Sequence, residues 1–213
     1  MRIFRFLSPL LLLFGLDAVV AAPLQTNPEE AKLYPYVVPE AAYYPRGVAD
    51  QEAAGATFKL GHGLAAALVH DNGGLVHNVS PEELRQAHLT AAQAREIALR
   101  NLQSAMASGT IVAKVFDAGP EGRPFILFSG HWLASSCILL PDLYHLASKR
   151  LGTTDILVSV PNRDAMLVFP KGDASYRQAM RALIREKESD GPKPLTFKLF
   201  GLTEAGPVEE DKE

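Results

Sequence analysis

Residues 156–169, ILVSVPNRDAMLVF, constrain the fold more than any other segment of the chain. Two apolar runs flank the four residues Pro161, Asn162, Arg163 and Asp164. Proline fixes one backbone dihedral, while Asn and Asp tolerate turn geometry and bond to nearby backbone. The segment therefore predicts a β-hairpin of two buried strands with its turn centred on residues 161–164.

Arg163 is the residue of this turn that the turn geometry does not require. Turn chemistry alone explains Asn162, Arg163 and Asp164 as structural residues. The alternative interpretation makes the three a binding triplet. In that hypothesis Asp164 shapes the loop, and Arg163 is the exposed group that a partner contacts.

The beginning of the chain, MRIFRFLSPLLLLFGLDAVVAAP, has Arg2 and Arg5 before an apolar run at residues 6–16, followed by small residues. This order is typical of a secretory signal peptide, with cleavage expected before Ala22. The alternative is an uncleaved membrane anchor, but the run is shorter than the roughly 20 residues that a bilayer requires. We therefore expect a periplasmic or secreted bacterial protein with no stable membrane span after signal cleavage.

Composition and charge exclude several classes of protein. Apolar residues make up 47% and charged residues 21% of the chain, which is too apolar for wholesale disorder. Loss of residues 1–21 removes two arginines and one aspartate, which changes the formal net charge from −3 to −4. Because a mildly acidic protein has no general attraction to nucleic acid or anionic lipid, no nucleic-acid partner is expected.

The one cysteine, Cys137, lies in the apolar stretch WLASSCILL. An exported chain without a cysteine pair must be stabilised by its core. An apolar setting raises the pKa of a thiol, so a packed, inert thiol is the favoured interpretation. A catalytic nucleophile and intermolecular pairing are the alternatives.

Hydrophobic periodicity and turn residues predict an α+β fold, with a mixed or antiparallel sheet built from hairpins and three main helices packed on it. The apolar run 132–140 is treated as a further strand. Strands are expected at 63–70, 75–79, 111–117, 124–128, 156–160, 165–169 and 195–201, and helices at 81–87, from 90 to 107, at 142–151 and at 174–188.

Three polar residues are expected to have structural roles. Ser80 followed by Glu83, and Thr90 followed by Gln93, each match a capping box at a helix N-terminus. Asn101 lies within the apolar face of the helix that follows Thr90. Because a polar amide on such a face must find hydrogen bonds, we expect Asn101 to bind neighbouring backbone.

The chain divides into four segments by composition: a signal peptide (1–21), a Pro/Tyr-rich arm (22–57), an α+β domain (58–202) and an acidic flexible tail (203–213). Five prolines in the arm forbid a continuous helix. The arm either lies over the domain or presents its aromatic side chains to a partner. In the second case Tyr43 and Tyr44 are candidate binding residues.

No recognisable catalytic or metal-binding set is present. His131 with Ser135, Ser136 and Cys137 supplies the groups of a nucleophilic site, yet there is no GxSxG motif. Glycine-rich nucleotide-binding motifs are also absent from the sequence. His70 and His77 can meet across the expected hairpin, but the sequence shows no third ligand beside them. The catalytic residues are therefore unknown, and no metal or cofactor is expected.

Several stretches in order resemble one family. LYPYVVP at 33–39, VSPEELRQAHLTAAQAREIALRNL at 79–102 and SSCILLPDLYHLASKRLGTTDILVSVPNRDAMLVF at 135–169 are similar to the bacterial family catalogued as domain of unknown function 1444. The hallmarks are the run 98–102, a Ser/Leu-rich segment before a helix, and the hairpin sequence at 160–164. The resemblance implies a mixed α+β domain and no established activity. The signal peptide and proline-rich arm depart from the usual pattern of the family.

These observations favour an exported, non-catalytic binding or interaction protein of the periplasm or cell envelope, whose partner is an unknown protein or small molecule. The alternative is a cell-envelope hydrolase that uses Ser135, Ser136 or Cys137 with His131. A small-molecule carrier is a third class, and it requires an enclosed apolar cavity.

Overall fold

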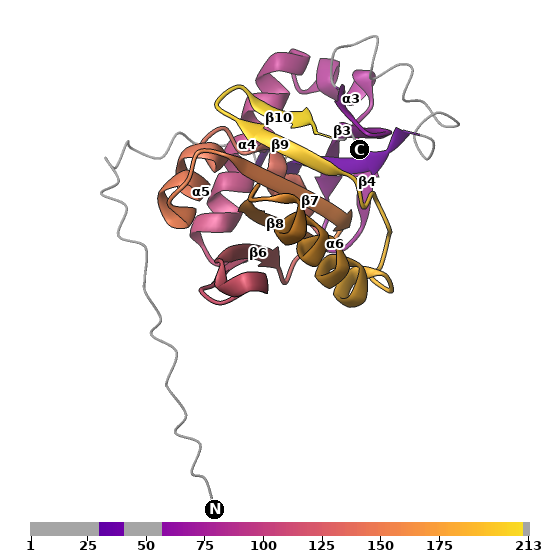
Figure 1. The fold of residues 1–213 in the computed structure, drawn as a ribbon. Coiled ribbons are helices and arrows are strands. Elements are labelled where there is room, and N and C mark those ends of the chain that lie inside the picture. The colour runs from indigo at the N-terminus through magenta and orange to yellow at the C-terminus, as the bar shows by residue number, and fades with distance from the viewer. Residues whose placement is uncertain (1–29, 41–56, 211–213) are drawn as a thin grey trace, which may run out of the picture.

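The computed structural model describes residues 30–40 and 57–210 of the chain (Figure 1). The expected signal peptide and the candidate residues Tyr43 and Tyr44 lie outside the described residues. The fold is α+β, as the sequence predicts, and its strands form two antiparallel sheets rather than one.

The larger sheet has six strands in the order β10-β9-β7-β8-β6-β5, all antiparallel. The predicted hairpins at 111–128 and 156–169 are both present, and the second forms the middle of the sheet. The strands are β5 (Val112–Phe116), β6 (Phe125–Ser129), β7 (Ile156–Asn162), β8 (Ala165–Pro170), β9 (Leu199–Thr203) and β10 (Gly206–Glu209).

The apolar runs of β7 and β8 are continuous because both faces of the hairpin are covered. On one face α6 (Ala174–Glu188) packs through Tyr176, Met180 and Ile184. On the other face Leu143 and Ala147 of α5 (Leu143–Leu151) join the main core. All seven residues of β7 are buried. Figure 1 shows α6 lying across β7 and β8.

The smaller sheet consists of β1 (Leu33–Pro39), β3 (Leu64–Asp71) and β2 (Phe58–Gly61), with the short β4 (Val76–Asn78) also paired to β3. Part of the expected arm is therefore a strand of the domain. Leu33 and Val37 are only 2% and 0% exposed because they pack in the cores, so the prediction that 22–57 is separate from the domain is wrong for β1.

Two successive helices follow β4, and their starts match the predicted signals. The helices are α3 (Pro81–Gln86) and α4 (Ala91–Ala107), and both capping boxes, at Ser80 and Thr90, are formed. The Nδ2 of Asn101 on α4 donates to the backbone oxygens of Glu30 (2.7 Å) and Leu33 (2.8 Å). Asn101 thereby fixes the start of β1, which follows the short 3-10 helix Glu30–Lys32.

The apolar run 132–140 is not a strand. Residues Ser135–Leu139 form a 3-10 helix, with backbone hydrogen bonds from Ser136 to Leu133 and from Cys137 to Ala134. A short apolar run does not distinguish a buried strand from a buried helical turn. Residues of this segment and of α5 pack in the same hydrophobic core.

The C-terminal predictions also require correction. The last predicted strand, 195–201, begins only at Leu199 and continues to Thr203. Residues 206–209, expected in a flexible tail, form β10 and pair with β9, because a two-residue turn brings the chain back along that strand. None of the helices within 30–40 and 57–210 combines the length and apolarity needed to cross a membrane.

Candidate functional site

The turn between β7 and β8 is shorter than the sequence predicts. Asn162 pairs with Ala165, so only Arg163 and Asp164 lie between the strands, and Pro161 belongs to β7. The pairing register shifts between Ser159 and Asn162. Because Pro161 has no N–H to donate, a break in the ladder at this point is expected.

Asn162, rather than Asp164, holds the turn in shape. It is 1% exposed, its Oδ1 accepts from the backbone N–H of Asp164 at 3.0 Å, and its Nδ2 donates to Glu188 Oε2 at 2.9 Å. The amide thus fastens the turn to the C-terminal end of α6. The structure gives Asn162 a structural position and leaves Arg163 and Asp164 nearer the surface.

Arg163 and Asp164 form a partly exposed ion pair. Arg163 Nε donates to Asp164 Oδ1 at 2.7 Å, and the two side chains are 25% and 35% exposed. The hydrogen bond that the Arg163 guanidinium donates to Asp164, together with one that it donates to the Tyr36 hydroxyl oxygen, raises the pKa of Arg163 against the effect of burial. Arg163 is consequently held in place and connected to β1 of the other sheet.

Aromatic side chains of β1 surround the single tryptophan beside this ion pair. Trp132 contacts Tyr34 and Tyr36 edge-on, with ring centroids 6.1 and 5.6 Å apart, and all three side chains are half-buried. Partly exposed aromatic groups of this kind are typical of binding surfaces. We call Tyr34, Tyr36, Trp132, Arg163 and Asp164 the aromatic–arginine surface.

The pKa values of His131, which borders the aromatic–arginine surface, and of Tyr34, which belongs to it, are both shifted. Burial lowers the pKa of His131, although the carboxylates of Asp71 and Asp164 oppose this effect. Burial, aided by Asp71, raises the pKa of Tyr34. At neutral pH His131 and Tyr34 are therefore both uncharged, and the net charge of the surface is small.

The groups proposed for a hydrolase do not form an open site. Ser135, Ser136 and Cys137 are all 0% exposed, and the two serine hydroxyls have no hydrogen-bond partner among the described residues. Burial raises the pKa of the Cys137 thiol, which disfavours the thiolate. His131 Nδ1 accepts from the backbone N–H of Leu133 at 3.3 Å. This arrangement does not supply an accessible nucleophile with a base.

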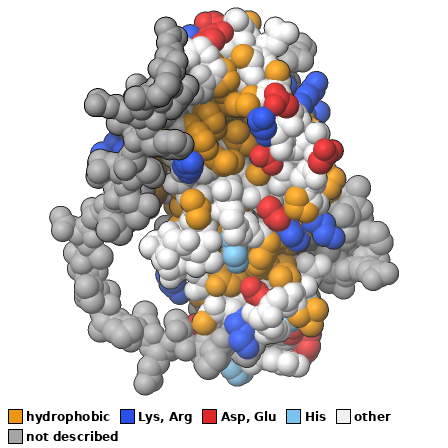
Figure 2. All heavy atoms as spheres, turned by 90° about the horizontal axis from the view of Figure 1, so that it is seen from below, with side chains coloured by type: hydrophobic (Ala, Val, Ile, Leu, Met, Phe, Trp, Pro, Cys, Tyr) orange, Lys and Arg blue, Asp and Glu red, His pale blue; other side chains and the backbone are white. Residues whose placement is uncertain are grey.

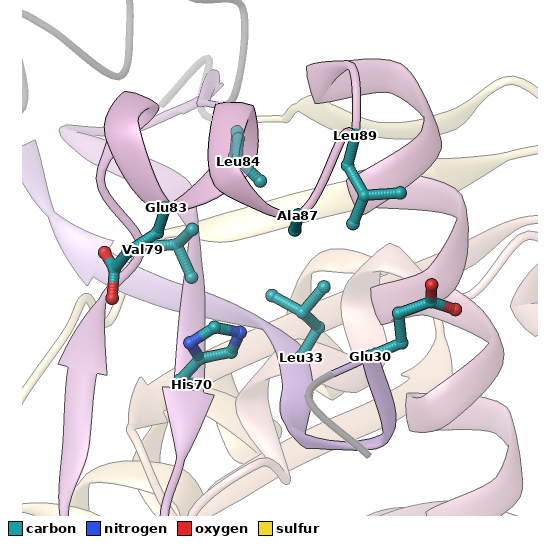
Figure 3. A pocket seen from close by; sticks show the side chains of 8 residues that line it. All are labelled: Glu30, Leu33, His70, Val79, Glu83, Leu84, Ala87 and Leu89. Atoms are coloured by element: carbon teal, nitrogen blue, oxygen red, sulfur yellow. The ribbon is translucent and has the colours of Figure 1, made fainter. Parts of the chain in front are cut away.

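A second group of polar side chains lies where β3 turns into β4, beside Leu33 at the start of β1. His70 and His77 face each other across β3 and β4, and Glu83 of α3 lies beside them. Figure 3 shows His70 and Glu83 at one side of a small pocket and Glu30 at the other. The remaining lining residues are Leu33, Val79, Leu84, Ala87 and Leu89. The open space for water-sized molecules is about 20 Å³, which suits a water or an ion rather than an organic ligand.

Exposed apolar side chains occur elsewhere, but they carry no comparable combination of groups. Figure 2 shows hydrophobic side chains gathered in separate areas of one face, with charged side chains around them. Among the described residues the most exposed large apolar side chains lie in different parts of the fold: Leu75 in the turn between β3 and β4, Val112 on β5, Leu146 on α5 and Val208 on β10. Scattered apolar residues of this kind are normal on a protein surface.

Comparison with known proteins adds no assignment: the chain matches no family model, no curated protein and no solved structure. The resemblance to domain of unknown function 1444 therefore stays a prediction.

Sequence reasoning missed most of the aromatic–arginine surface and the third member of the histidine group. The sequence predicts that Trp132 lies in a buried apolar run and that Tyr34 and Tyr36 lie in an arm outside the domain. The alternation of LYPYVVP, with Leu33 and Val37 on one face and the tyrosines on the other, is the signal that indicates a strand. Glu83 was assigned only to its capping box.

Proposed function

We propose that this protein is an exported, non-catalytic binding protein of the cell envelope, and that it recognises a polypeptide partner through the aromatic–arginine surface. The observation that carries the proposal is the packing of Trp132 against Tyr34 and Tyr36 beside the Arg163–Asp164 ion pair. Trp, Tyr and Arg are the residue types that supply most binding energy at protein interfaces.

The geometry of β1 favours recognition through side chains. β1 is an edge strand of the smaller sheet, and it contains Pro35 and Pro39. Because proline lacks an N–H, an edge strand with two prolines is a poor template for the addition of another strand. The tyrosines and Trp132 present partly exposed rings instead, with Arg163 as the charged group beside them.

Export and the family resemblance belong to the same proposal. They rest on the Arg-containing apolar start of the chain and on the order of the stretches at 33–39, 79–102 and 135–169. The burial of Ser135, Ser136 and Cys137 gives the competing hydrolase proposal no accessible nucleophile. We therefore favour a binding protein over a hydrolase.

Affinity capture with matched variants tests the proposed surface. The purified protein is immobilised and incubated with the envelope fraction of its own cells, and bound proteins are identified. We expect a polypeptide to be retained by the native protein, and the Trp132→Ala and Arg163→Ala variants to lose about tenfold or more of it. Leu146→Ala, at an exposed apolar residue of α5, is the control and should retain it fully.

The two site variants differ in their structural risk. Trp132 packs partly against the core, so the stability of its variant is measured by thermal unfolding. Arg163 is a partly exposed member of an ion pair and belongs to none of the hydrophobic core clusters, so its removal leaves the core intact. Retention of the same polypeptide by native protein and folded Arg163→Ala and Trp132→Ala variants would refute the proposal.

A further inference from the structure

The local fold brings three metal-ligating side chains together within fourteen residues of sequence. The β3–β4 hairpin places His70 directly opposite His77, and their rings lie 5.4 Å apart. A hydrogen bond from the Gly74 N–H to Asp71 Oδ1 stabilises the turn of this hairpin. The chain then enters α3, whose third residue is Glu83.

The capping box aims the carboxylate of Glu83 back at the hairpin. Glu83 Oε2 accepts from the backbone N–H of Ser80 at 2.6 Å, and Oε1 lies 3.0 Å from His77 Nε2. One carboxylate oxygen thus stabilises the helix start while the other faces the imidazoles. The second oxygen is available as a ligand without loss of the cap.

We propose that His70, His77 and Glu83 form a binding site for a divalent transition-metal ion, with zinc as the best match. One potential ligand atom of each residue lies within 4.8 Å of those of the other two. Two imidazoles and a carboxylate are a donor set that Zn²⁺ accepts, and three protein ligands leave one position for water. Ca²⁺ and Mg²⁺ prefer all-oxygen sites, so this donor set disfavours them.

The ligand atoms need only a small movement to reach bonding distance. With bonds of about 2.1 Å, ligand atoms in a tetrahedral site lie about 3.4 Å apart. The His77–Glu83 pair is already closer than this, at 3.0 Å. Rotation of the half-buried His70 ring supplies the remaining adjustment, and the adjoining pocket has room for a metal-bound water.

For the ion to bind His77 Nε2, the proton between this nitrogen and Glu83 Oε1 must leave: a neutral ring takes up a proton at Nδ1 in exchange, and an imidazolium ring releases its Nε2 proton to solvent. Since a metal-bound imidazole nitrogen carries no proton, binding weakens in acidic buffer.

Titration of the chelator-treated protein with ZnCl₂, followed by calorimetry and by the unfolding temperature, tests the site. We expect one Zn²⁺ per chain and a rise in the unfolding temperature, and no effect of MgCl₂. Loss of a direct ligand, in His70→Ala, His77→Ala or Glu83→Gln, should weaken zinc binding roughly tenfold or more.

Glu83→Gln is the decisive variant because it preserves the fold. Glutamine satisfies a capping box as well as glutamate does, and Gln93 occupies the same position at the start of α4. His145→Ala, at an exposed histidine of α5, is the control and should bind zinc as the native protein does. Absence of zinc binding, equal affinity in Glu83→Gln, or an equal loss in His145→Ala would overturn the proposal.

Discussion

Single polar residues connect the elements of this fold. The Nδ2 of Asn101 donates to two backbone oxygens at the entrance to β1, those of Glu30 and Leu33. We expect Asn101→Ala to lower the free energy of unfolding by about 1–3 kcal/mol, because two partly buried carbonyl groups lose their donor.

Urea unfolding measures this loss. Gln103→Ala, two residues further along α4 at an exposed position, is the matched control and should change stability by less than about 0.5 kcal/mol. An Asn101→Ala variant as stable as the Gln103→Ala variant would show that the two hydrogen bonds contribute nothing net.

Cys137 provides a residue-scale test of the hydrolase alternative. Its side chain is buried, its thiol lies 3.8 Å from the backbone oxygen of Leu133, and burial raises its pKa. We therefore expect a thiol reagent to react with the native protein only as slowly as the protein unfolds, and at once in denaturant. Rapid modification of the folded protein would instead support a reactive cysteine.

At the scale of elements, the two helix starts after β4 depend on local signals. Ser80 and Thr90 each accept a hydrogen bond from the backbone of the residue three positions later. We expect Ser80→Ala and Thr90→Ala each to cost about 1 kcal/mol of stability. Ser104→Ala, at an exposed position inside α4, should be neutral or slightly stabilising by comparison, and equal losses in all three variants would contradict a capping role.

Elements with such local signals are the ones that the sequence predicts well. The hairpins at 64–78, 112–129 and 156–170 and the helix 174–188 follow from turn residues, caps and periodicity within one segment. β1 and the 3-10 helix at 135–139 depend on distant neighbours. Pro35 and Pro39 are tolerated because β1 is an edge strand, whose partner β3 begins only at Leu64. β10 pairs with the adjacent β9 across a two-residue turn, but the acidic composition of residues 203–213 favours a flexible tail and hides this hairpin.

The candidate sites were harder to predict for the same reason. Trp132 meets Tyr34 and Tyr36 across about a hundred residues of chain, and only the packing of the two sheets brings them together. The hairpin predicts that His70 and His77 lie close together. The capping box already explains Glu83, so the sequence does not indicate that it is a third potential ligand. Glu83 uses one carboxylate oxygen to cap α3 and the other to contact His77.

For the whole molecule, the pKa shifts predict two steps in stability as pH falls. The folded-state pKa of His131 lies below the ordinary histidine value, so the unfolded chain takes up the proton first. The contribution of His131 to the free energy of unfolding is fully present above about pH 6.5 and is lost as pH falls through its folded-state pKa. Glu83, whose folded-state pKa is also lowered, adds a second loss below its ordinary value of 4.5.

Urea midpoints between about pH 7.5 and about pH 3 resolve the two steps, because they bracket the ordinary pKa values of histidine and glutamate. In His131→Asn, whose side-chain oxygen can replace Nδ1 as acceptor for Leu133, the upper step should disappear while the lower step remains. If the loss of stability at about pH 6.5 is unchanged in this variant, a group other than His131 causes it.

Site-specific photo-crosslinking in intact cells tests directly whether the aromatic–arginine surface binds a polypeptide. A benzophenone amino acid replaces Tyr36, within this surface, or Leu146, on the exposed side of α5. After irradiation we predict a discrete crosslinked product from position 36 and none from position 146, with the product strongly reduced by Arg163→Ala. If the folded protein gives no product at position 36, or the same product from both positions, the aromatic–arginine surface is not a specific binding site for a polypeptide.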